Sequence, residues 1–231
     1  PQGDYRSVVW GCEKTYLYSM QPQNYGKAEV ISMWGFTDVR KCWNYAGFEG
    51  KPVEVIAFSG AEEVELLLNG VPVGKKAVQK DGTLPNSVRF VLPYEKGVLE
   101  AVSYTDGKEV SRDRLATTGE PAEIRLIPEK KELRADGHDV AFVQIEILDQ
   151  NGLLVTDAQI PLKAVFSGVG ELSGFGSANP VTEDNYTLPE THSFRGRATA
   201  VIRSGYEQGS AELVIENVQL GSFRTEIRML L

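Results

Sequence analysis

Short segments in which apolar and polar residues alternate dominate the chain from residue 51 onward. In EVELLL (63–68), Val64, Leu66 and Leu68 fall on one face of an extended chain, and Glu63 and Glu65 fall on the other. Such alternation is typical of a strand with one buried face, because successive side chains point to opposite sides. The pattern recurs in PVEVIAF (52–58), AFVQIEIL (141–148), SAELVIEN (210–217) and FRTEIRML (223–230). No segment beyond residue 50 keeps a helical period over ten residues, so we predict an all-β protein.

Turn-forming dipeptides separate these segments. They are Asn69-Gly70, Asp81-Gly82, Asp106-Gly107, Asp136-Gly137 and Asn151-Gly152. Asparagine, aspartate and glycine tolerate the positive φ angles of tight turns. Asn69-Gly70 and Asp106-Gly107 stand directly between two strand-like segments, which predicts two tight hairpins. Short strands with turns every 8–12 residues or so are typical of β-sandwiches rather than of a parallel sheet.

The segment LATTGEPAEI (115–124) marks a boundary between two domains. It leads from the end of one strand through Thr-Thr-Gly-Glu-Pro into a new strand at Ile124 to Ile127. Each side then holds roughly 110 residues and about seven candidate strands, the usual size of one immunoglobulin-like sandwich. We therefore expect two tandem immunoglobulin-like β-sandwiches, over residues 1–118 and 119–231.

The first fifty residues differ from the rest, because they hold all three tryptophans and five of the nine tyrosines and show weak periodicity. We expect an irregular segment whose aromatic side chains pack on a domain outside this chain or contact a sugar. The residues concerned are Trp10, Trp34, Trp43 and Tyr45. Burial in the core is the default for any one of them. We expect at least two of the four to stay partly exposed.

Charge and composition narrow the classes of partner. A net charge of -8 with a pI near 5.0 argues against nucleic-acid binding, which needs a basic patch. No apolar run reaches the ~18 residues that a membrane span requires, and the first ten residues lack the apolar core of a signal peptide. Because the chain does not begin with Met, we expect a fragment or a processed product. The cysteines, Cys12 and Cys42, are expected to be unpaired thiols, with a Cys12–Cys42 bridge as the alternative, and they leave the cellular compartment open.

The residue types that carry catalysis do not combine into a known motif. His138 and His192 lie in loop-like segments, and no Gly-x-Ser-x-Gly sequence supplies a nucleophile. Neither histidine has a second His or Cys at ligand spacing, so we expect no metal. The glycine-rich segment GVGELSGFGSANP (168–180) does not lead into a helix, which favours a loop or a bulged strand over a phosphate site. We expect no catalytic residue and no cofactor.

Residues 43–76, WNYAGFEGKPVEVIAFSGAEEVELLLNGVPVGKK, resemble the segment that follows the catalytic barrel in family 2 glycoside hydrolases of the β-galactosidase type. Trp43 and Tyr45 take the place of the family's aromatic pair, and Ser59 to Gly70 match its strand and turn. The segment LRADGHDVAFVQIEILDQNGLLVTDA (133–158) is similar to the last immunoglobulin-like domain of these enzymes. It also resembles repeats of bacterial adhesins.

The resemblance implies a non-catalytic C-terminal region of such a hydrolase. The family's acid/base glutamate follows an asparagine, and no Asn-Glu pair occurs in this sequence. Catalysis would then belong to a barrel of the same polypeptide, which would be the main partner of this region. The alternatives are a carbohydrate-binding module with a saccharide as its partner, and a structural spacer of the adhesin type. On any of these three hypotheses the chain by itself should not hydrolyse galactosides.

Overall fold

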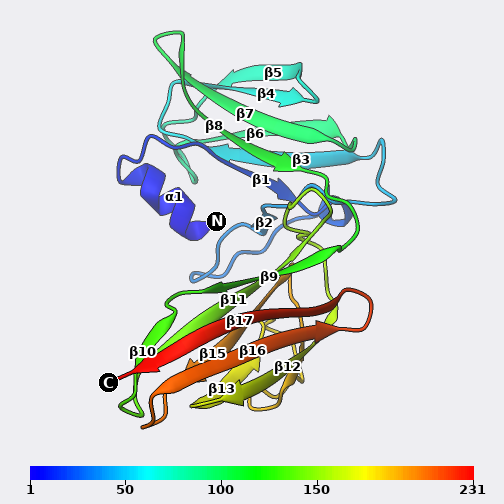
Figure 1. Ribbon diagram of the computed structural model, residues 1–231. Coiled ribbons are helices and arrows are strands. Elements are labelled where there is room, and N and C mark those ends of the chain that lie inside the picture. Colours follow the sequence, from blue (N-terminus) through cyan, green and yellow to red (C-terminus); the bar gives the residue numbers. More distant parts are fainter. The chain divides into compact units, whose positions relative to one another are not determined.

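The computed structural model describes all 231 residues, and the chain divides into two compact units, Pro1–Thr117 and Thr118–Leu231 (Figure 1). Antiparallel sheets make up most of both units, which confirms the predicted all-β class. Each unit holds two sheets with apolar residues buried between them. No helix in the chain combines the length and apolar character needed to cross a membrane.

The first unit contains a sheet of strand order β2-β1-β3-β6 and a sheet of order β5-β4-β7-β8. Its elements are α1 (Gln2–Val9), β1 (Tyr16–Met20), the 3-10 helix η1 (Pro22–Asn24), β2 (Val39–Arg40), β3 (Pro52–Phe58), β4 (Glu63–Leu68), β5 (Val71–Ala77), β6 (Ser87–Pro93), β7 (Val98–Thr105) and β8 (Lys108–Ala116). The expectation of an irregular N-terminal segment is therefore wrong for residues 2–9 and 16–20. Strand β1 lies inside its sheet, paired with both β2 and β3.

The two predicted hairpins are confirmed. Asn69 and Gly70 have φ angles of 54° and 78° between β4 and β5, and Leu68 pairs directly with Val71. Asp106 and Gly107, with φ angles of 51° and 71°, form the same two-residue turn between β7 and β8. Positive φ at both central positions matches the right-handed twist of the flanking strands, which is why Asn-Gly and Asp-Gly favour this turn.

Strand β4 has the predicted register over most of its length. Val64 and Leu66 are fully buried, whereas the Glu63 carboxylate reaches Lys75 Nζ at 2.7 Å and the Glu65 carboxylate accepts a hydrogen bond from Tyr104 Oη at 3.0 Å. Leu68 departs from the prediction because it is only half-buried. The pairing of β4 with β5 shifts by a bulge after Leu66, and Leu68 lies at the hairpin end beyond it.

A third layer covers the outer face of the β2-β1-β3-β6 sheet. Val8 of α1 is buried in one cluster with Tyr18, Val39, Ile56 and Phe58, which point away from the space between the two sheets. As a result β3 is buried on both faces, and every residue from Val55 to Phe58 is inaccessible to solvent. A sheet covered on both sides produces a continuous apolar run instead of strict alternation.

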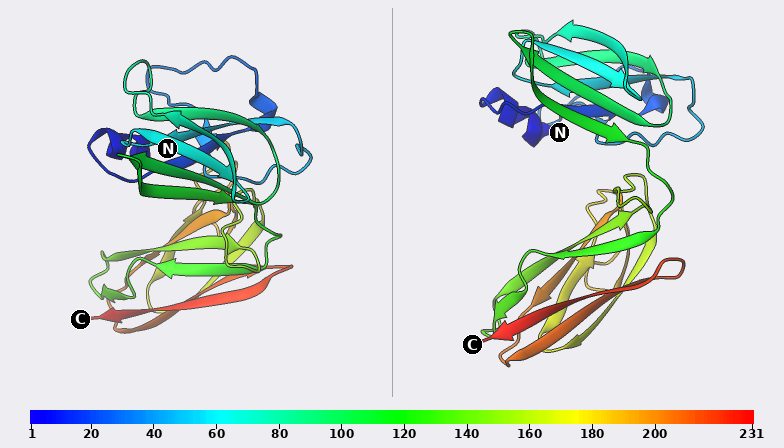
Figure 2. Two further views of the ribbon diagram at one scale, coloured as in Figure 1. Left: turned by 90° about the horizontal axis from the view of Figure 1, so that it is seen from above. Right: turned by 45° about the horizontal axis from the view of Figure 1, so that its top comes forward.

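The second unit is a two-sheet sandwich with one core (Figure 2). Its elements are β9 (Glu123–Pro128), β10 (Glu132–Arg134), β11 (Val140–Leu148), β12 (Pro161–Gly168), β13 (Glu171–Gly176), β14 (Glu190–His192), β15 (Arg197–Arg203), β16 (Gly209–Asn217) and β17 (Gly221–Leu230). The strand orders are β10-β17-β16-β12-β14 and β13-β15-β11-β9. All pairs are antiparallel except β10 with β17. The glycine-rich segment contains β13, whose pairing with β15 shifts between Leu172 and Gly174, so of the two expected forms, a loop or a bulged strand, residues 171–176 take the second.

Candidate docking surface

Trp43 is a core residue of the first unit. It is fully buried and makes edge contacts with Tyr94 and Tyr45, at centroid distances of 5.1 and 6.2 Å. Its indole Nε1 donates a 2.9 Å hydrogen bond to the carbonyl oxygen of Glu95. The expectation that Trp43 contacts a domain outside this chain or a sugar is therefore wrong. A buried indole needs a partner for its single N–H group, and the backbone after β6 supplies that partner.

Tyr45 is half-buried and belongs to the same aromatic cluster. Its ring lies 5.6 Å from that of Tyr94, and its hydroxyl oxygen lies 2.7 Å from Ser19 Oγ on β1. Burial is the main cause that raises the pKa of Tyr45, so the hydroxyl remains protonated and available as a donor. Tyr45 thus ties the loop before β3 to β1, and most of its contacts are internal to the unit.

The carbonyl oxygen of Trp43 also anchors the end of this unit. It accepts hydrogen bonds from Tyr94 Oη at 3.1 Å and from Thr117 Oγ1 at 2.8 Å. Thr117 is the last residue of the first unit and is 74 positions away in sequence. The aromatic cluster therefore fixes the loop that precedes β3 and the residue that follows β8.

Helix α1 is held on the sheet by aromatic and polar contacts. The Tyr5 ring lies 5.2 Å from that of Phe58 and 5.5 Å from that of Phe36. Tyr18 Oη donates a 2.5 Å hydrogen bond to the Asp4 carboxylate. Burial, reinforced by this carboxylate, raises the pKa of Tyr18 above its ordinary value, so the phenol stays neutral. Trp10 follows the helix and is 80% exposed, beside the exposed Val9.

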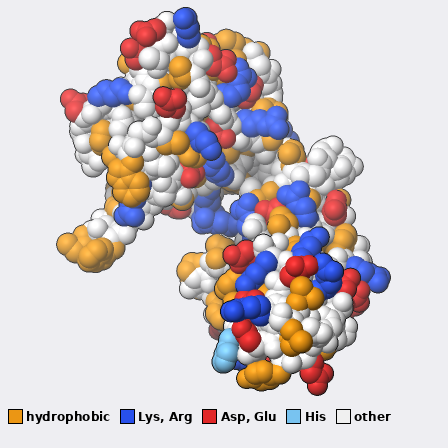
Figure 3. Space-filling view, turned by 60° about the vertical axis from the view of Figure 1, so that its left-hand side comes forward, with side chains coloured by type: hydrophobic (Ala, Val, Ile, Leu, Met, Phe, Trp, Pro, Cys, Tyr) orange, Lys and Arg blue, Asp and Glu red, His pale blue; other side chains and the backbone are white.

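The apolar loop, defined here as residues 29–38, presents the other exposed tryptophan. Trp34 and Met33 are each 87% exposed, and Val30 is also almost fully exposed. Hydrophobic side chains stand out from this unit in the space-filling view (Figure 3). Trp10 and Trp34 thus meet the expectation that at least two of the four aromatics are exposed. Met33 and Val30 are not aromatic, so the density of aromatic residues in the sequence provided no signal for them.

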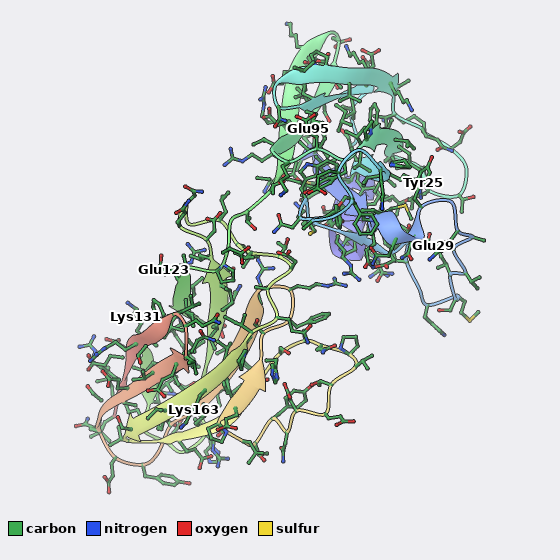
Figure 4. All side chains as sticks on the ribbon, turned by 90° about the vertical axis from the view of Figure 1, so that its right-hand side faces the viewer. Tyr25, Glu29, Glu95, Glu123, Lys131 and Lys163 are labelled. Atoms are coloured by element: carbon green, nitrogen blue, oxygen red, sulfur yellow. The ribbon has the colours of Figure 1, made fainter.

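The base of the apolar loop is braced by one carboxylate. Glu29 Oε1 accepts a 2.6 Å hydrogen bond from the backbone N–H of Asp38, and Oε2 accepts one of 3.0 Å from Thr37 Oγ1. Thr37 is itself buried. At the tip, the N–H of Gly35 donates to the carbonyl oxygen of Ser32 at 2.8 Å. Figure 4 shows Glu29 on the segment that leads into the loop. Hydrogen bonds thus hold the loop at its base and at its tip, while its apolar side chains remain exposed to water.

The two histidines belong to the second unit and the two cysteines to the first. His138 is exposed in a turn, and His192 is exposed at the end of β14 rather than in a loop. Its Nδ1 lies 3.5 Å from Asp184. Cys42 is buried and Cys12 half-exposed, and both are free thiols. No group of three or more His, Cys, Asp or Glu residues is placed to hold a metal ion.

Comparison with known proteins finds one family match in each unit. Residues 124–226 match the family described as "Glycoside hydrolase family 2 C-terminal domain 5", and residues 50–111 match a "Domain of unknown function (DUF4982)". Beta-galactosidase BoGH2A of Bacteroides ovatus is 32% identical over 172 residues, which are 74% of this chain and 20% of the relative. A beta-glucuronidase of Formosa agariphila is 28% identical over 71% of this chain and 17% of its own length.

A solved structure shares the whole fold. The glycosyl hydrolase family 2 member from Bacteroides cellulosilyticus superposes with a TM-score of 0.93 at 29% identity. The match covers 100% of this chain and 30% of that protein. The present chain thus spans about a fifth of the first curated relative and under a third of the solved structure.

Proposed function

We propose that this chain, which belongs to glycoside hydrolase family 2 as a non-catalytic C-terminal region, buttresses the catalytic barrel of the same polypeptide. The relatives named beta-galactosidase and beta-glucuronidase are about five and about six times as long, respectively, as the segments they share with this chain. The reaction of the whole protein would be the hydrolysis of a glycosidic bond, with the catalytic carboxylates outside these 231 residues.

The apolar loop carries this proposal. Exposed apolar side chains gathered on one braced element are unusual on a surface that faces only water. Burying a large apolar side chain contributes about 1.5–3 kcal/mol relative to leaving it in water. Docking would therefore gain several kcal/mol from burial of Trp34, Met33 and Val30. The hydrogen bonds of Glu29 already hold the base of the loop, which lowers the entropy that the loop would lose on docking. The barrel is the favoured partner because it belongs to the same polypeptide.

The test compares one substitution in two contexts. In the 231-residue chain, Trp34→Ala should change the free energy of unfolding by less than about 0.5 kcal/mol, because the side chain makes few contacts there. In the full-length protein the same change should lower the unfolding temperature and the turnover of a chromogenic galactoside or glucuronide. Val110→Ala, a half-exposed position on β8, is the matched control and should have no effect in either context.

Two results would contradict the docking role. One is a full-length protein that tolerates Trp34→Ala as well as Val110→Ala does. The other is equal destabilisation of the short chain and the full-length protein, which would mean that Trp34 acts within the first unit alone.

A further inference from the structure

The outer face of the β13-β15-β11-β9 sheet in the second unit is hollowed over a volume of about 740 Å³. Its floor includes Phe142 and Gln144 of β11, Ile127 of β9 and Thr199 of β15. Phe194 and Arg195, from the turn before β15, form one wall. We call this feature the sheet hollow. A volume of this size lies within the usual range of roughly 300–1,000 Å³ for small-molecule sites.

The floor of the sheet hollow is apolar where a solvated sheet face is normally polar. Phe142 is 48% exposed and Ile127 is 39% exposed. Alternation along β11 turns Val143 and Ile145 into the core, so Phe142 must face outward together with Gln144. Ile127 is paired with Gln144, and Glu129 lies opposite Phe142, so the aromatic and the aliphatic side chain are diagonal neighbours on a partly exposed sheet face.

A carboxylate on the same face of β11 holds the polar groups around this floor in place. Gln144 Nε2 donates a 2.9 Å hydrogen bond to Glu146 Oε1, and Arg197 donates to the same oxygen at 3.3 Å from both Nε and Nη2. Arg125 Nη2 donates to Glu146 Oε2 at 2.5 Å. The Glu146 side chain is only 8% exposed. A buried carboxylate thus orients an amide and a guanidinium, which reduces the entropy that either would lose on binding a ligand.

Arg195 occupies a backbone conformation that does not suit its residue type. It has a φ of 53° and Gly196 has a φ of 72° in the two-residue turn that joins Phe194 to Arg197. The other non-glycine residues with positive φ are Asn69, Asn86 and Asp106. These types tolerate the left-handed region, whereas a longer side chain is disfavoured there. The guanidinium carbon of Arg195 lies 5.1 Å from the centroid of the Phe194 ring, at the rim of the sheet hollow.

We infer that the sheet hollow binds a saccharide of a few pyranose units. The C–H face of a sugar ring is apolar and would pack on Phe142 and Ile127. Its hydroxyl groups both donate and accept, and would pair with the Gln144 amide, Thr199 hydroxyl and Arg195 guanidinium. An apolar floor bordered by an amide, a hydroxyl and guanidinium groups is complementary to this ligand class, and the strained Arg195 is the kind of residue that functional sites retain. The site lies in the second unit and does not depend on the docking role of the first.

Isothermal titration of the 231-residue chain tests this site with two probes. β-1,4-Galactotriose represents neutral saccharides, and trigalacturonic acid represents acidic ones that would use the arginine side chains more strongly. At least one probe should bind. Phe142→Ala should weaken that binding roughly tenfold, as the loss of one well-packed aromatic contact predicts. Val165→Ala is the matched control, because Val165 has a similar exposure of 41% on the opposite sheet.

Arg195→Gly separates binding from folding. Glycine adopts positive φ without strain, so this variant should unfold at the same or a higher temperature than the unsubstituted chain. Its affinity for the saccharide should nevertheless fall severalfold. Unchanged affinity in both Phe142→Ala and Arg195→Gly would overturn the assignment. So would an absence of binding to both probes and to a printed glycan array. A dimer that Phe142→Ala dissociates, with no saccharide binding, would assign the sheet hollow to self-association instead.

Discussion

The two units of this chain share an architecture of two sheets but differ in how the outer faces are covered. In the first unit, α1 and the apolar loop region close one outer face, and β3 is buried on both sides. In the second unit, the outer face of β11 leaves Phe142 and Gln144 open. An added layer changes the sequence pattern of the strand beneath it from alternating to continuous. The difference shows that a β-sandwich signature predicts the sheets but does not reveal what packs on them.

The largest expected effect separates the cores of the two units. Trp43→Ala should destabilise the first unit by about 3–5 kcal/mol, because a fully buried indole and its hydrogen bond to Glu95 are lost. The second unit should be unaffected if the two are independent domains, as the sequence predicts. Differential scanning calorimetry should then show one transition shifted and one unchanged. A uniform shift of both transitions would show that the units unfold together.

The second unit, unlike the first, should lose stability in acid through the contact of Glu146 with Arg125 and Arg197. Burial opposes ionisation of Glu146, but hydrogen bonds and charge from Arg125 and Arg197 hold its pKa below the ordinary value. A lowered pKa in the folded state means that this stabilisation is complete above the unfolded pKa of about 4.3 and is lost as the pH falls through the folded pKa. Glu146→Gln should therefore cost about 1–3 kcal/mol at neutral pH and progressively less in acid.

Denaturant titrations between neutral and acidic pH measure this difference. Glu171→Gln is the control, since Glu171 pairs with Arg203 on the same sheet but its side chain is 52% exposed. It should change stability little at any pH. A Glu146→Gln penalty that stays constant into acid would contradict the ionic origin of the effect.

The smallest of these effects concerns the added layer. Val8→Ala removes two methyl groups from the contact of α1 with the sheet and should cost about 1–2 kcal/mol. Amide hydrogen exchange should accelerate in residues 2–9 and leave β4 to β8 unchanged, because those strands belong to the other cluster or the opposite sheet. Val9→Ala, at the exposed neighbouring position, should leave exchange unchanged. Equal acceleration across all strands would mean that the layer is part of the main core.

The sequence predicted the strands whose two faces have different surroundings. EVELLL and AFVQIEIL alternate because one side meets the core and the other meets water, and Asn69-Gly70 and Asp106-Gly107 supply the φ angles of their turns. Strand β1, YLYSM, gave no such signal, because Leu17, Tyr18 and Ser19 are all buried. Helix α1 and Phe58 cover its Tyr18 side, and residues distant in sequence cover its Leu17 side. Period-based reasoning cannot detect such a strand.

Local sequence patterns also fail to separate two of the candidate site residues, Trp43 and Trp34. Both follow short irregular segments, yet one is buried and the other is 87% exposed. Burial of Trp43 depends on Tyr94 and Glu95, about fifty positions later, and no local pattern encodes that contact. Arg195 left a detectable signal, since an Arg-Gly pair before a strand-like segment occupies a turn position where Asn-Gly would be expected.

The inner position of β1 has a consequence for the solubility of shortened chains. The match to the domain of unknown function begins at residue 50, which leaves β1 outside it. A chain cut there would lose the partner of Val55 to Phe58 and leave β3 as an open edge with apolar side chains on both faces. Such an edge is a template for strand addition between molecules. Residues 1–49 therefore cover this edge, and a chain that begins at residue 50 should aggregate more readily than the 231-residue chain.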